Sequence, residues 1–274
     1  MSAYQSLIIN CDSAWREMKK NKSKILLAVD MGNTAVTAGI FRGRTLVEDR
    51  ISADIKNFRK ELARLLKTVN GAKAGAVYVS SVVPCRDILL AGILRKATGL
   101  NPHFIKLKDA GIPVLCDRPF EVGTDRILNA VAAHRLSTRE AIVVDCGTAT
   151  TFDAVSRKGE YLGGAITAGI GISSEALWTR CAKLRRRFSL KTPGRILGRN
   201  TVDAMRSGII NGHTSMIEGM VARLKKELRS DPVVIGTGGY ISLVARSTKI
   251  FDIIDPDLTL KGIWLVWQKK QVKS

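Results

Sequence analysis

Two similar stretches, Leu26-Leu-Ala-Val-Asp-Met-Gly-Asn-Thr-Ala35 and Ile142-Val-Val-Asp-Cys-Gly-Thr-Ala149, decide the fold. Each begins with a continuous apolar run, which predicts a buried strand, and continues into Asp-x-Gly, which predicts a turn. Their aspartates, Asp30 and Asp145, lie 115 residues apart. Because the strand, the acid, the glycine and a following Thr-Ala all match, we interpret the pair as the sign of a duplicated domain.

Strands and helices alternate around both stretches. Apolar runs and alternating residues predict strands, whereas apolar residues spaced three or four apart predict helices. Such alternation is typical of α/β layers. The expected strands are 25–29, its hairpin partner 35–41, 76–79, 141–144, 151–155 and 233–235, and the expected helices are 58–69, 88–97, 126–136, 173–183, 201–229 and 241–246.

The composition is that of a globular protein. The chain has 274 residues, of which 45% are hydrophobic and 25% charged, so it can bury a core without disulfides or metals. Uncharged stretches are too short for a membrane-spanning helix, and no signal peptide is evident. The five cysteines are scattered without Cys-x-x-Cys, which indicates reduced thiols and a cytoplasmic location. Three scattered histidines give a zinc site little support.

The charge is strongly positive. Lys and Arg number 44 against 24 Asp and Glu, a net charge of +20 that attracts anions. Residues 50–108 carry 12 basic and 3 acidic side chains, and residues 180–206 carry 9 and 1. This excess fits either a general basic bias or an anionic partner. Because no nucleic-acid-binding module accompanies it, we expect no specific nucleic acid partner.

Each Asp-x-Gly turn is a candidate phosphate loop. Glycine lets backbone N–H groups approach phosphate oxygens, and a carboxylate at the strand end suits Mg²⁺. The alternative for Asp30 is a simple Asx turn within a hairpin. In the second stretch Asp145, beside Gly147, is the better site candidate, and Asp153 is expected to face solvent or a neighbouring turn.

The segment Glu121-Val-Gly-Thr-Asp-Arg126 opens a predicted helix. Thr124 is the expected N-cap, and Asp125 in the first turn complements the helix dipole. The same residues also offer a base beside an anion clamp suited to a carboxylate substrate. The turns at 163–169, 198–202 and 237–239 are interpreted as structural glycine turns, with Asn200-Thr201 at the start of the next helix.

Taken together in order, these motifs resemble the type III pantothenate kinases over residues 25–265. The resemblance implies the fold of the acetate and sugar kinase/heat-shock chaperone/actin superfamily: two duplicated ribonuclease H-like α/β domains with an inter-domain nucleotide cleft. The expected division is a basic extension at 1–24, an N-terminal domain at 25–135 and a C-terminal domain at 136–274. The motifs are Asp30–Thr34, Ser80–Pro84, Gly123–Arg126, Asp145–Thr150, Gly163-Gly164 with Gly169, Asn200-Thr201, Thr237–Gly239 and Asp255-Pro-Asp-Leu-Thr-Leu260.

The resemblance also implies an activity. Type III pantothenate kinases phosphorylate pantothenate with ATP in the first step of coenzyme A synthesis, as homodimers that need Mg²⁺ and a monovalent cation, K⁺ or NH₄⁺. Asp125 would accept the proton, Asp145 would bind the monovalent cation, and Thr148 would contact ATP. Pantothenate would be held by Gly123, Thr124, Asp125, Arg126 and Thr201, and the first phosphate loop would be Asp30, Met31, Gly32, Asn33, Thr34, Ala35, Val36 and Thr37.

Two positions depart from the family pattern. Ala168 stands where a proline is common in the Gly-Gly turn, and Cys116 stands where a tyrosine is common before the Gly-x-Asp-Arg segment. Neither removes an expected catalytic group. Two alternatives stay open at this point: a non-catalytic, nucleotide-binding regulatory relative, and a kinase of another small hydroxy acid.

Overall fold

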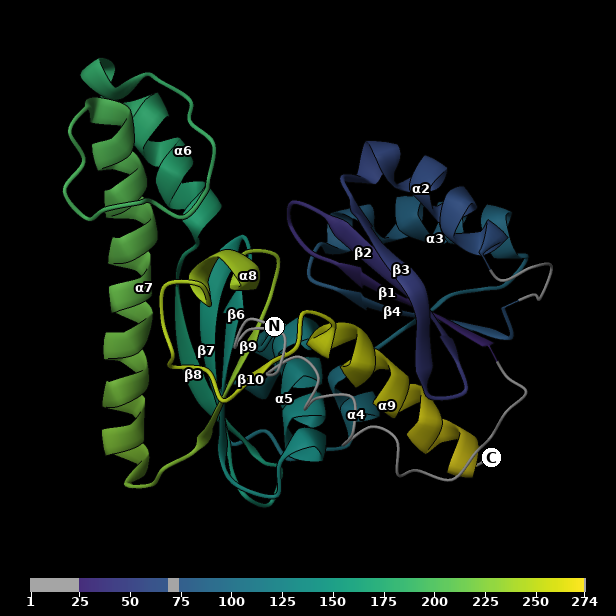
Figure 1. The fold of residues 1–274 in the computed structure, drawn as a ribbon. Helices are drawn as coiled ribbons and strands as arrows, with labels where there is room; N and C mark the ends of the chain where they lie inside the picture. Colours follow the sequence, from purple (N-terminus) through teal and green to yellow (C-terminus); the bar gives the residue numbers. More distant parts are fainter. Residues whose placement is uncertain (1–24, 69–73, 274) are drawn as a thin grey trace. The chain divides into compact units, whose positions relative to one another are not determined.

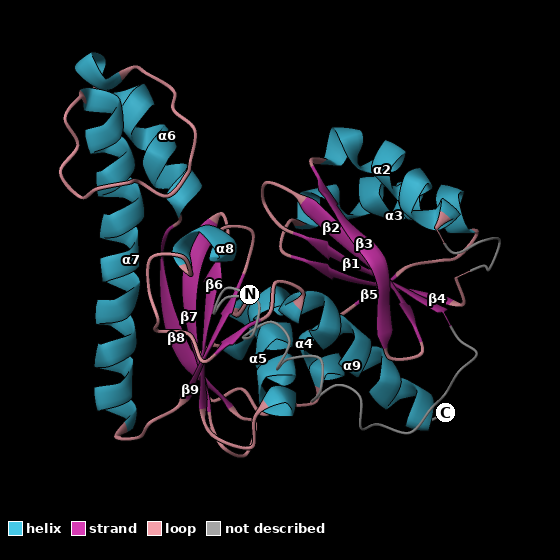
Figure 2. Cartoon of the chain, viewed as in Figure 1, coloured by secondary structure: helices cyan, strands magenta, loops and turns pink. Residues whose placement is uncertain are grey.

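The computed structural model describes residues 25–68 and 74–273, so the expected extension at 1–24 lies outside the described residues. The described chain forms two compact units (Figures 1 and 2). The N-terminal unit contains residues up to 132 and also residues from 258 onward, and the C-terminal unit contains 133–257. The expected division assigned 258–274 to the second domain. The structure groups this segment with the first unit because its helix packs on the first sheet.

The N-terminal unit is built on a five-stranded mixed sheet. Its order is β3-β2-β1-β4-β5, with β1 at the centre. β1 pairs antiparallel with β2, which confirms the expected hairpin, and parallel with β4. The strands are β1 (Ile25–Met31), β2 (Val36–Arg42), β3 (Thr45–Ala53), β4 (Ala76–Ser81) and β5 (His103–Phe104).

Helices cover the central strand β1. The side chains of Ile25, Leu27, Val29 and Met31 alternate along it and pack with the buried residues of α2 (Ile55–Lys67) and α3 (Asp87–Thr98). The intervening Leu26 and Ala28 are equally buried, as expected for a strand covered on both faces. A further helix, α9 (Leu258–Lys273), also contacts β1, β2 and β4. The sequence patterns did not predict this helix. Short elements are η1 (Pro84–Arg86), α4 (Leu107–Ala110) and η2 (Pro119–Glu121).

The far end of α9 is fixed by a partly buried charge cluster. Lys270 Nζ lies 2.8 Å from Asp109 Oδ1 and 2.9 Å from His103 Nε2. Burial would raise the pKa of Asp109. The backbone N–H of Lys106 and the side chains of Lys270 and His103 more than offset it and lower that pKa to about 2. Asp109 is therefore an ionised, structural carboxylate at neutral pH.

The C-terminal unit repeats the strand order of the first. Its sheet runs β10-β9-β6-β7-β8, with β6 antiparallel to β7 and parallel to β9. Figure 2 shows the strands in magenta. The strands are β6 (Ala141–Cys146), β7 (Ala149–Val155), β8 (Tyr161–Ala168), β9 (Val233–Thr237) and β10 (Ile253–Ile254).

The sequence suggested a glycine turn at 163–169, but most of this segment belongs to a strand. Residues up to Ala168 form β8 and pair with β7, because the neighbouring strand supplies ladder hydrogen bonds that glycine does not prevent. Gly163 has φ 126°, and the β7–β8 register shifts beside its partner Ala154.

Long helix α7 (Thr201–Leu228) supports this sheet, and the prediction at 201–229 is confirmed. Its buried residues Ile210, Ile217 and Val221 pack with alternate residues of β6, and Figure 1 shows the helix alongside the strands. Asn200 caps the helix by accepting the N–H of Asp203 at 2.9 Å. The remaining helices are α5 (Thr124–Leu136), α6 (Ile170–Arg180), η3 (Ala182–Leu184) and α8 (Ile241–Val244), of which α8 is shorter than expected.

Asp153 lies inside the protein, contrary to the expectation that it faces solvent or a turn. It is fully buried on β7. The hydroxyl of Tyr161 donates to its Oδ1 at 2.7 Å, and the hydroxyl of Thr151 donates to its Oδ2 at 3.0 Å. Both faces of β7 are covered here, since Phe152 and Ala154 are buried as well, and these hydroxyls compensate the buried carboxylate. Asp153 therefore has a structural environment.

Within the described ranges, no helix is both long and apolar enough to cross a membrane.

The buried histidine on α7 predicts a pH-dependent stability. His213 Nε2 lies 2.9 Å from the Thr150 hydroxyl, and burial lowers the pKa of His213. An unfolded histidine protonates near pH 6.5, whereas the folded one resists protonation. Stability supplied by the neutral ring is therefore present above about pH 6.5 and falls as the pH drops toward the folded pKa, by at most about 1.4 kcal/mol per pH unit.

Urea unfolding of wild type and His213→Gln between pH 8 and pH 5.5 measures this effect. The free energy of unfolding should fall more steeply in wild type than in the variant, whose amide does not titrate. Parallel pH curves for the two proteins would show that His213 contributes nothing.

Candidate functional site

In the N-terminal unit, candidate site residues gather where β1 and β4 end. Because the two strands run parallel, their carboxyl ends lie side by side, with Asp30 opposite Ser80. After Asp30 the chain turns, and the N–H of Gly32 donates to the carbonyl of Ala35 at 3.0 Å. Asn33 and Thr34 are exposed at the tip of the turn. Both residues are therefore accessible from solvent.

Two residues of the expected loop point elsewhere. The side chains of Met31 and Val36 are buried in the hydrophobic core with β1, α2 and α3. Only their backbone groups remain for a ligand. Thr37 is half-buried on β2, where its hydroxyl donates to Ser52 at 3.3 Å.

Helix α5 begins at the end of β4. The hydroxyl of Thr124 donates to the carbonyl of Ser81 at 3.1 Å and lies 3.3 Å from the Ser80 hydroxyl. The sequence suggested that Thr124 caps the helix. Its hydroxyl instead joins the helix to the strand. Gly123 precedes the helix, and its carbonyl accepts the N–H of Ile127 at 3.2 Å.

Asp125 stands in the first turn of α5, half-buried. Its Oδ1 accepts the N–H of Arg126 at 2.7 Å. Burial raises the pKa of Asp125, and the N–H and positive charge of Arg126 oppose that rise. A Cβ at Gly123 would lie 2.5 Å from Asp125 Oδ1, so only glycine leaves the carboxylate in this position. The result is a partly desolvated carboxylate beside an arginine, suited to accepting a proton.

In the C-terminal unit, a second acidic turn follows β6. The N–H of Gly147 donates to the carbonyl of Ala149 at 3.1 Å, and Thr148 is half-buried at the tip. Asp145 is half-buried at the position on β6 that Asp30 has on β1, the last but one residue. Cys146 lies between Asp145 and Gly147. Burial raises the pKa of its thiol, and the charge of Asp145 raises it further. Cys146 is therefore a neutral packing residue.

Glycines let two other loops close in on this turn. A Cβ at Gly169 would lie 2.4 Å from the Thr148 carbonyl oxygen, and one at Gly238 would lie 2.3 Å from Asp145 Oδ1. Gly238 also has φ 94°, a conformation that side chains rarely adopt. The N–H of Tyr240 donates to the Cys146 carbonyl at 2.9 Å. Three loops thus meet around Asp145.

The structure brings most of the expected site residues into two groups and leaves Thr201 outside both. Asp30, Thr124 and Asp125 come together through the ends of β1 and β4, and Asp145 and Thr148 share one turn. Thr201 is exposed in the first turn of α7, and no described contact joins it to either group.

Sequence reasoning did not identify Ser80, Ser81, Gly238 and Tyr240 as site residues. Ser80 and Ser81 end a buried strand, which was a usable signal, because polar residues at the carboxyl ends of parallel strands commonly line sites. The contacts of Gly238 and Tyr240 have no local signal, since both depend on backbone about 90 residues away.

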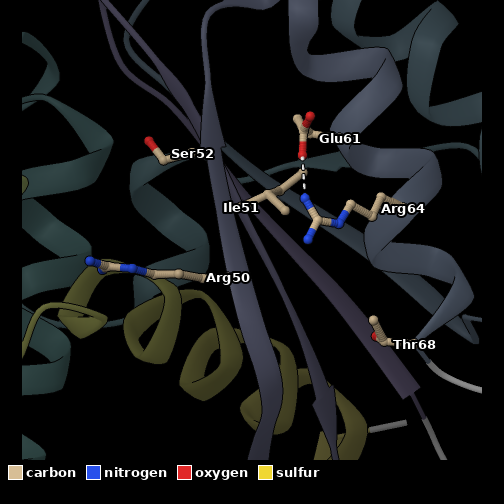
Figure 3. Close-up of a pocket in the computed structure, with 6 residues that line it drawn as sticks. All are labelled: Arg50, Ile51, Ser52, Glu61, Arg64 and Thr68. Atoms are coloured by element: carbon tan, nitrogen blue, oxygen red, sulfur yellow. Dashed lines mark ion pairs between the residues drawn. The ribbon is translucent and has the colours of Figure 1, made fainter.

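Two cavities among the described residues lie away from these groups. One of about 340 Å³ lies against β3 and α2 (Figure 3). Arg64 there is 3.8 Å from Glu61, an exposed pair of little energetic weight. Another, of about 760 Å³, is lined by Arg223, Lys226, Glu227 and Arg229. Neither contains an expected site residue.

A Mg²⁺ ion at the Asp30 turn would take most of its ligands from phosphates and water. Within residues 25–68 and 74–273, no three His, Cys, Asp or Glu side chains are grouped as a metal site. A single carboxylate at a strand end is nevertheless the usual protein contribution to Mg²⁺, which takes its other ligands from phosphates and water. Asp30 fits that pattern.

Comparison with known proteins gives one consistent family. Residues 26–223 match the family model of type III pantothenate kinase. The type III pantothenate kinase of Syntrophus aciditrophicus is 43% identical over 254 residues, covering 89% of this chain and 99% of the relative. That of Myxococcus xanthus is 43% identical over 251 residues, covering 89% and 98%.

Solved structures share the fold at low sequence identity. A Baf-family transcriptional activator from Campylobacter jejuni superposes with a TM-score of 0.60 at 19% identity, covering 90% of this chain and 99% of that one. The activator of 2-hydroxyisocaproyl-CoA dehydratase from Clostridium difficile, solved with bound ADPNP, has a TM-score of 0.51 at 13% identity, with coverages of 91% and 97%. At these identities the likeness shows an α/β fold of the acetate and sugar kinase/heat-shock chaperone/actin type.

The close approach at Gly238 predicts a specific loss of stability. Gly238→Ala should lower the free energy of unfolding by about 1–3 kcal/mol or more, because the new Cβ meets Asp145 and the Cys146 backbone at a positive φ. The matched control is Gly239→Ala, whose Cβ meets nothing within 4 Å. Thermal unfolding of both variants provides the measurement. Equal melting temperatures would contradict the geometry.

Proposed function

The chain belongs to the type III pantothenate kinase family, and from that premise we propose how its site residues carry out the reaction. It phosphorylates pantothenate with ATP in coenzyme A biosynthesis. In that transfer the pantothenate hydroxyl oxygen bonds to the γ-phosphorus, the bond from the γ-phosphorus to the ADP oxygen breaks, and the hydroxyl proton must leave. Phosphoryl transfer depends mostly on positioning and charge stabilisation, so each residue is assigned one of these tasks.

Asp125 is the proton acceptor in this proposal. The observation that carries it is the carboxylate at the start of α5, half-buried and with its pKa raised by burial. A base whose pKa is raised holds a proton more firmly, and the neighbouring Arg126 keeps it ionised before the transfer. Asp125 orients the primary hydroxyl of pantothenate and takes its proton as the phosphoryl group arrives.

The neighbours of Asp125 hold the substrate. Gly123, Thr124 and Arg126 surround the helix start, where N–H groups and a guanidinium favour an anion. Arg126 offsets the substrate carboxylate or the charge that develops in the transition state. Thr201 is proposed as a further pantothenate contact on the basis of its match to the family motif.

The acidic turn after β1 receives ATP phosphates. The tip residues Gly32, Asn33, Thr34 and Ala35 provide backbone N–H groups and a hydroxyl, with Met31, Val36 and Thr37 shaping the turn. Asp30 would hold Mg²⁺, which neutralises phosphate charge when bound. In the C-terminal unit, Thr148 would contact ATP from the corresponding turn.

Asp145 would bind the monovalent cation, K⁺ or NH₄⁺. Gly147 and Gly238 leave no Cβ against its carboxylate, and a Cβ at Gly238 would fill the space beside Oδ1. The Asp145 carboxylate would supply the charged oxygen ligand for such a cation. The cation would add positive charge where phosphates bind.

The finer architecture also belongs to this proposal. Both units are proposed to be duplicated ribonuclease H-like domains, which the equal strand orders and the matching acid positions support. The nucleotide cleft between the domains, the homodimer and the cytoplasmic location follow from the family and stay predictions.

A coupled assay of ADP release tests the function. Purified protein, ATP, Mg²⁺ and K⁺ are incubated with pantothenate and with a panel of other small hydroxy acids. Turnover with pantothenate at the highest kcat/KM is expected. Faster turnover of another acid would reassign the substrate, and ATP binding without turnover would favour the non-catalytic regulatory alternative.

Asp125→Asn should lower kcat by about 10²–10⁴-fold, because the amide cannot accept the proton. ATP binding should be nearly unchanged, since Asp125 is assigned to the hydroxyl and not to the phosphates. Steady-state kinetics and ATP titration provide the two readouts.

Asp231→Asn is the control for this variant, because Asp231 is an exposed surface carboxylate whose side chain is 77% accessible. Circular dichroism checks that both variants fold. Activity of a folded Asp125→Asn within about threefold of wild type would remove Asp125 from its role.

The rate should depend on the monovalent cation. We expect faster turnover in K⁺ or NH₄⁺ than in Na⁺, and no such difference in Asp145→Asn, which has lost the charged ligand. The buffers must share one ionic strength, because a chain with a net charge of +20 responds to screening alone. Equal wild-type rates in all three cations would exclude the cation site.

A further inference from the structure

The motif Asp255-Pro-Asp-Leu-Thr-Leu260 has no role in the mechanism above, yet it leads directly into α9. Helix α9 belongs to the same unit as the start of α5, which carries Asp125 and Arg126. Two residues in the first turn and a half of α9, Thr259 and Gly262, contact α5. These contacts are polar and close.

Thr259 makes the polar contact. Its hydroxyl donates to Asn129 Oδ1 at 2.8 Å. Asn129 is fully buried on α5, four residues after Asp125 and therefore on the same face of the helix, one turn further along. A buried amide oxygen needs its hydrogen-bond donors. This hydrogen bond therefore restrains both rotation of α5 about its axis and sliding of α5 along that axis.

Gly262 makes the close contact. A Cβ there would lie 2.3 Å from the carbonyl oxygen of Leu128 and 2.7 Å from its carbonyl carbon. The backbones of α9 and α5 therefore touch next to Asn129. At the other end of the same turn, the Thr124 hydroxyl holds the Ser81 carbonyl at 3.1 Å. The residues of the first turn thus lie between two fixed points.

Helix α9 is itself fixed to the sheet. Trp264 is buried, and its Nε1 donates to the carbonyl of Gly43, beyond β2, at 2.7 Å. Its ring stacks on Phe41 with the centroids 6.1 Å apart. Helix α9 also contacts β1, the strand that carries Asp30. It therefore transmits the position of the sheet to α5.

We infer that Thr259 is a positioning residue for the reaction: through Asn129 it sets where the Asp125 carboxylate stands. The inference rests on the proposed role of Asp125 as the proton acceptor. Displacing a reacting group by about 1 Å can cost about 10²-fold in rate, so a looser α5 should affect the transfer before it affects nucleotide binding.

The test compares Thr259→Val, which keeps the shape and removes the hydroxyl, with Thr259→Ser, which keeps the hydroxyl. Thr259→Val should lower kcat by about tenfold with KM for ATP within about twofold of wild type, and Thr259→Ser should retain kcat within about twofold. The matched control is Thr98→Val. Thr98 lies in the same unit, and its hydroxyl donates to Leu94 of α3 at 2.8 Å, away from α5. Its kcat should equal that of wild type.

Melting temperatures separate positioning from stability, with kinetics measured well below them. A folded Thr259→Val with kcat within twofold of wild type would overturn the inference, whatever its melting temperature. So would an equal loss in Thr259→Ser. If Thr259→Val does not fold, the smaller Thr259→Ala is judged by the same criteria. An inactive Asp125→Asn with a fully active Thr259→Val would refute the positioning alone, whereas an active Asp125→Asn would refute the proton-acceptor role itself.

Discussion

The attachment of α5 to the end of β4 is the contact on which the N-terminal site depends. Thr124 reaches the Ser81 carbonyl, and Ser80 stands opposite Asp30 in the parallel pairing. One side-chain hydrogen bond thus places the first turn of a helix against the ends of two central strands. A strand-end carbonyl needs a partner, and satisfying it with the helix fixes the acid that follows.

The acidic turns of the two units use the same geometry with one residue of difference. In both, the acid is the last but one residue of the central strand. The N–H of the glycine two residues later donates across the turn to a carbonyl further along the chain. The acceptor is three residues on at Gly32 and two residues on at Gly147. The second turn is the more enclosed, because Gly169 and Gly238 bring two further loops against it.

Two carboxylates of the N-terminal unit show how partners decide the effect of burial. Burial raises the pKa of Asp125, and the N–H and charge of Arg126, with the N–H of Asp125 itself, oppose that rise only in part. Asp109 is also desolvated, but Lys270, His103 and a backbone N–H lower its pKa to about 2. The first carboxylate suits proton transfer, whereas the second suits fixing a helix. Helix α9 joins the two, since Lys270 is near one end and Thr259 near the other.

The sequence alone determined the central strands, the hairpin after β1, most helices and the two acidic turns, because these features follow from local periodicity and turn chemistry. It also determined the family, through short motifs in a fixed order. The tertiary structure decided what depends on distant backbone. The first ten residues of α9 have buried apolar side chains on several sides, so periodicity did not reveal the helix. Strand β8 was hidden by glycines that only a neighbouring strand orders. Asp153 is buried because both faces of β7 are covered, and Tyr161 and Thr151 offer hydroxyls to its carboxylate. Thr124 joins a strand instead of capping a helix because β4 ends beside it. A residue pattern determines which groups are available, but only the packing of segments far apart in the chain determines which of them meet.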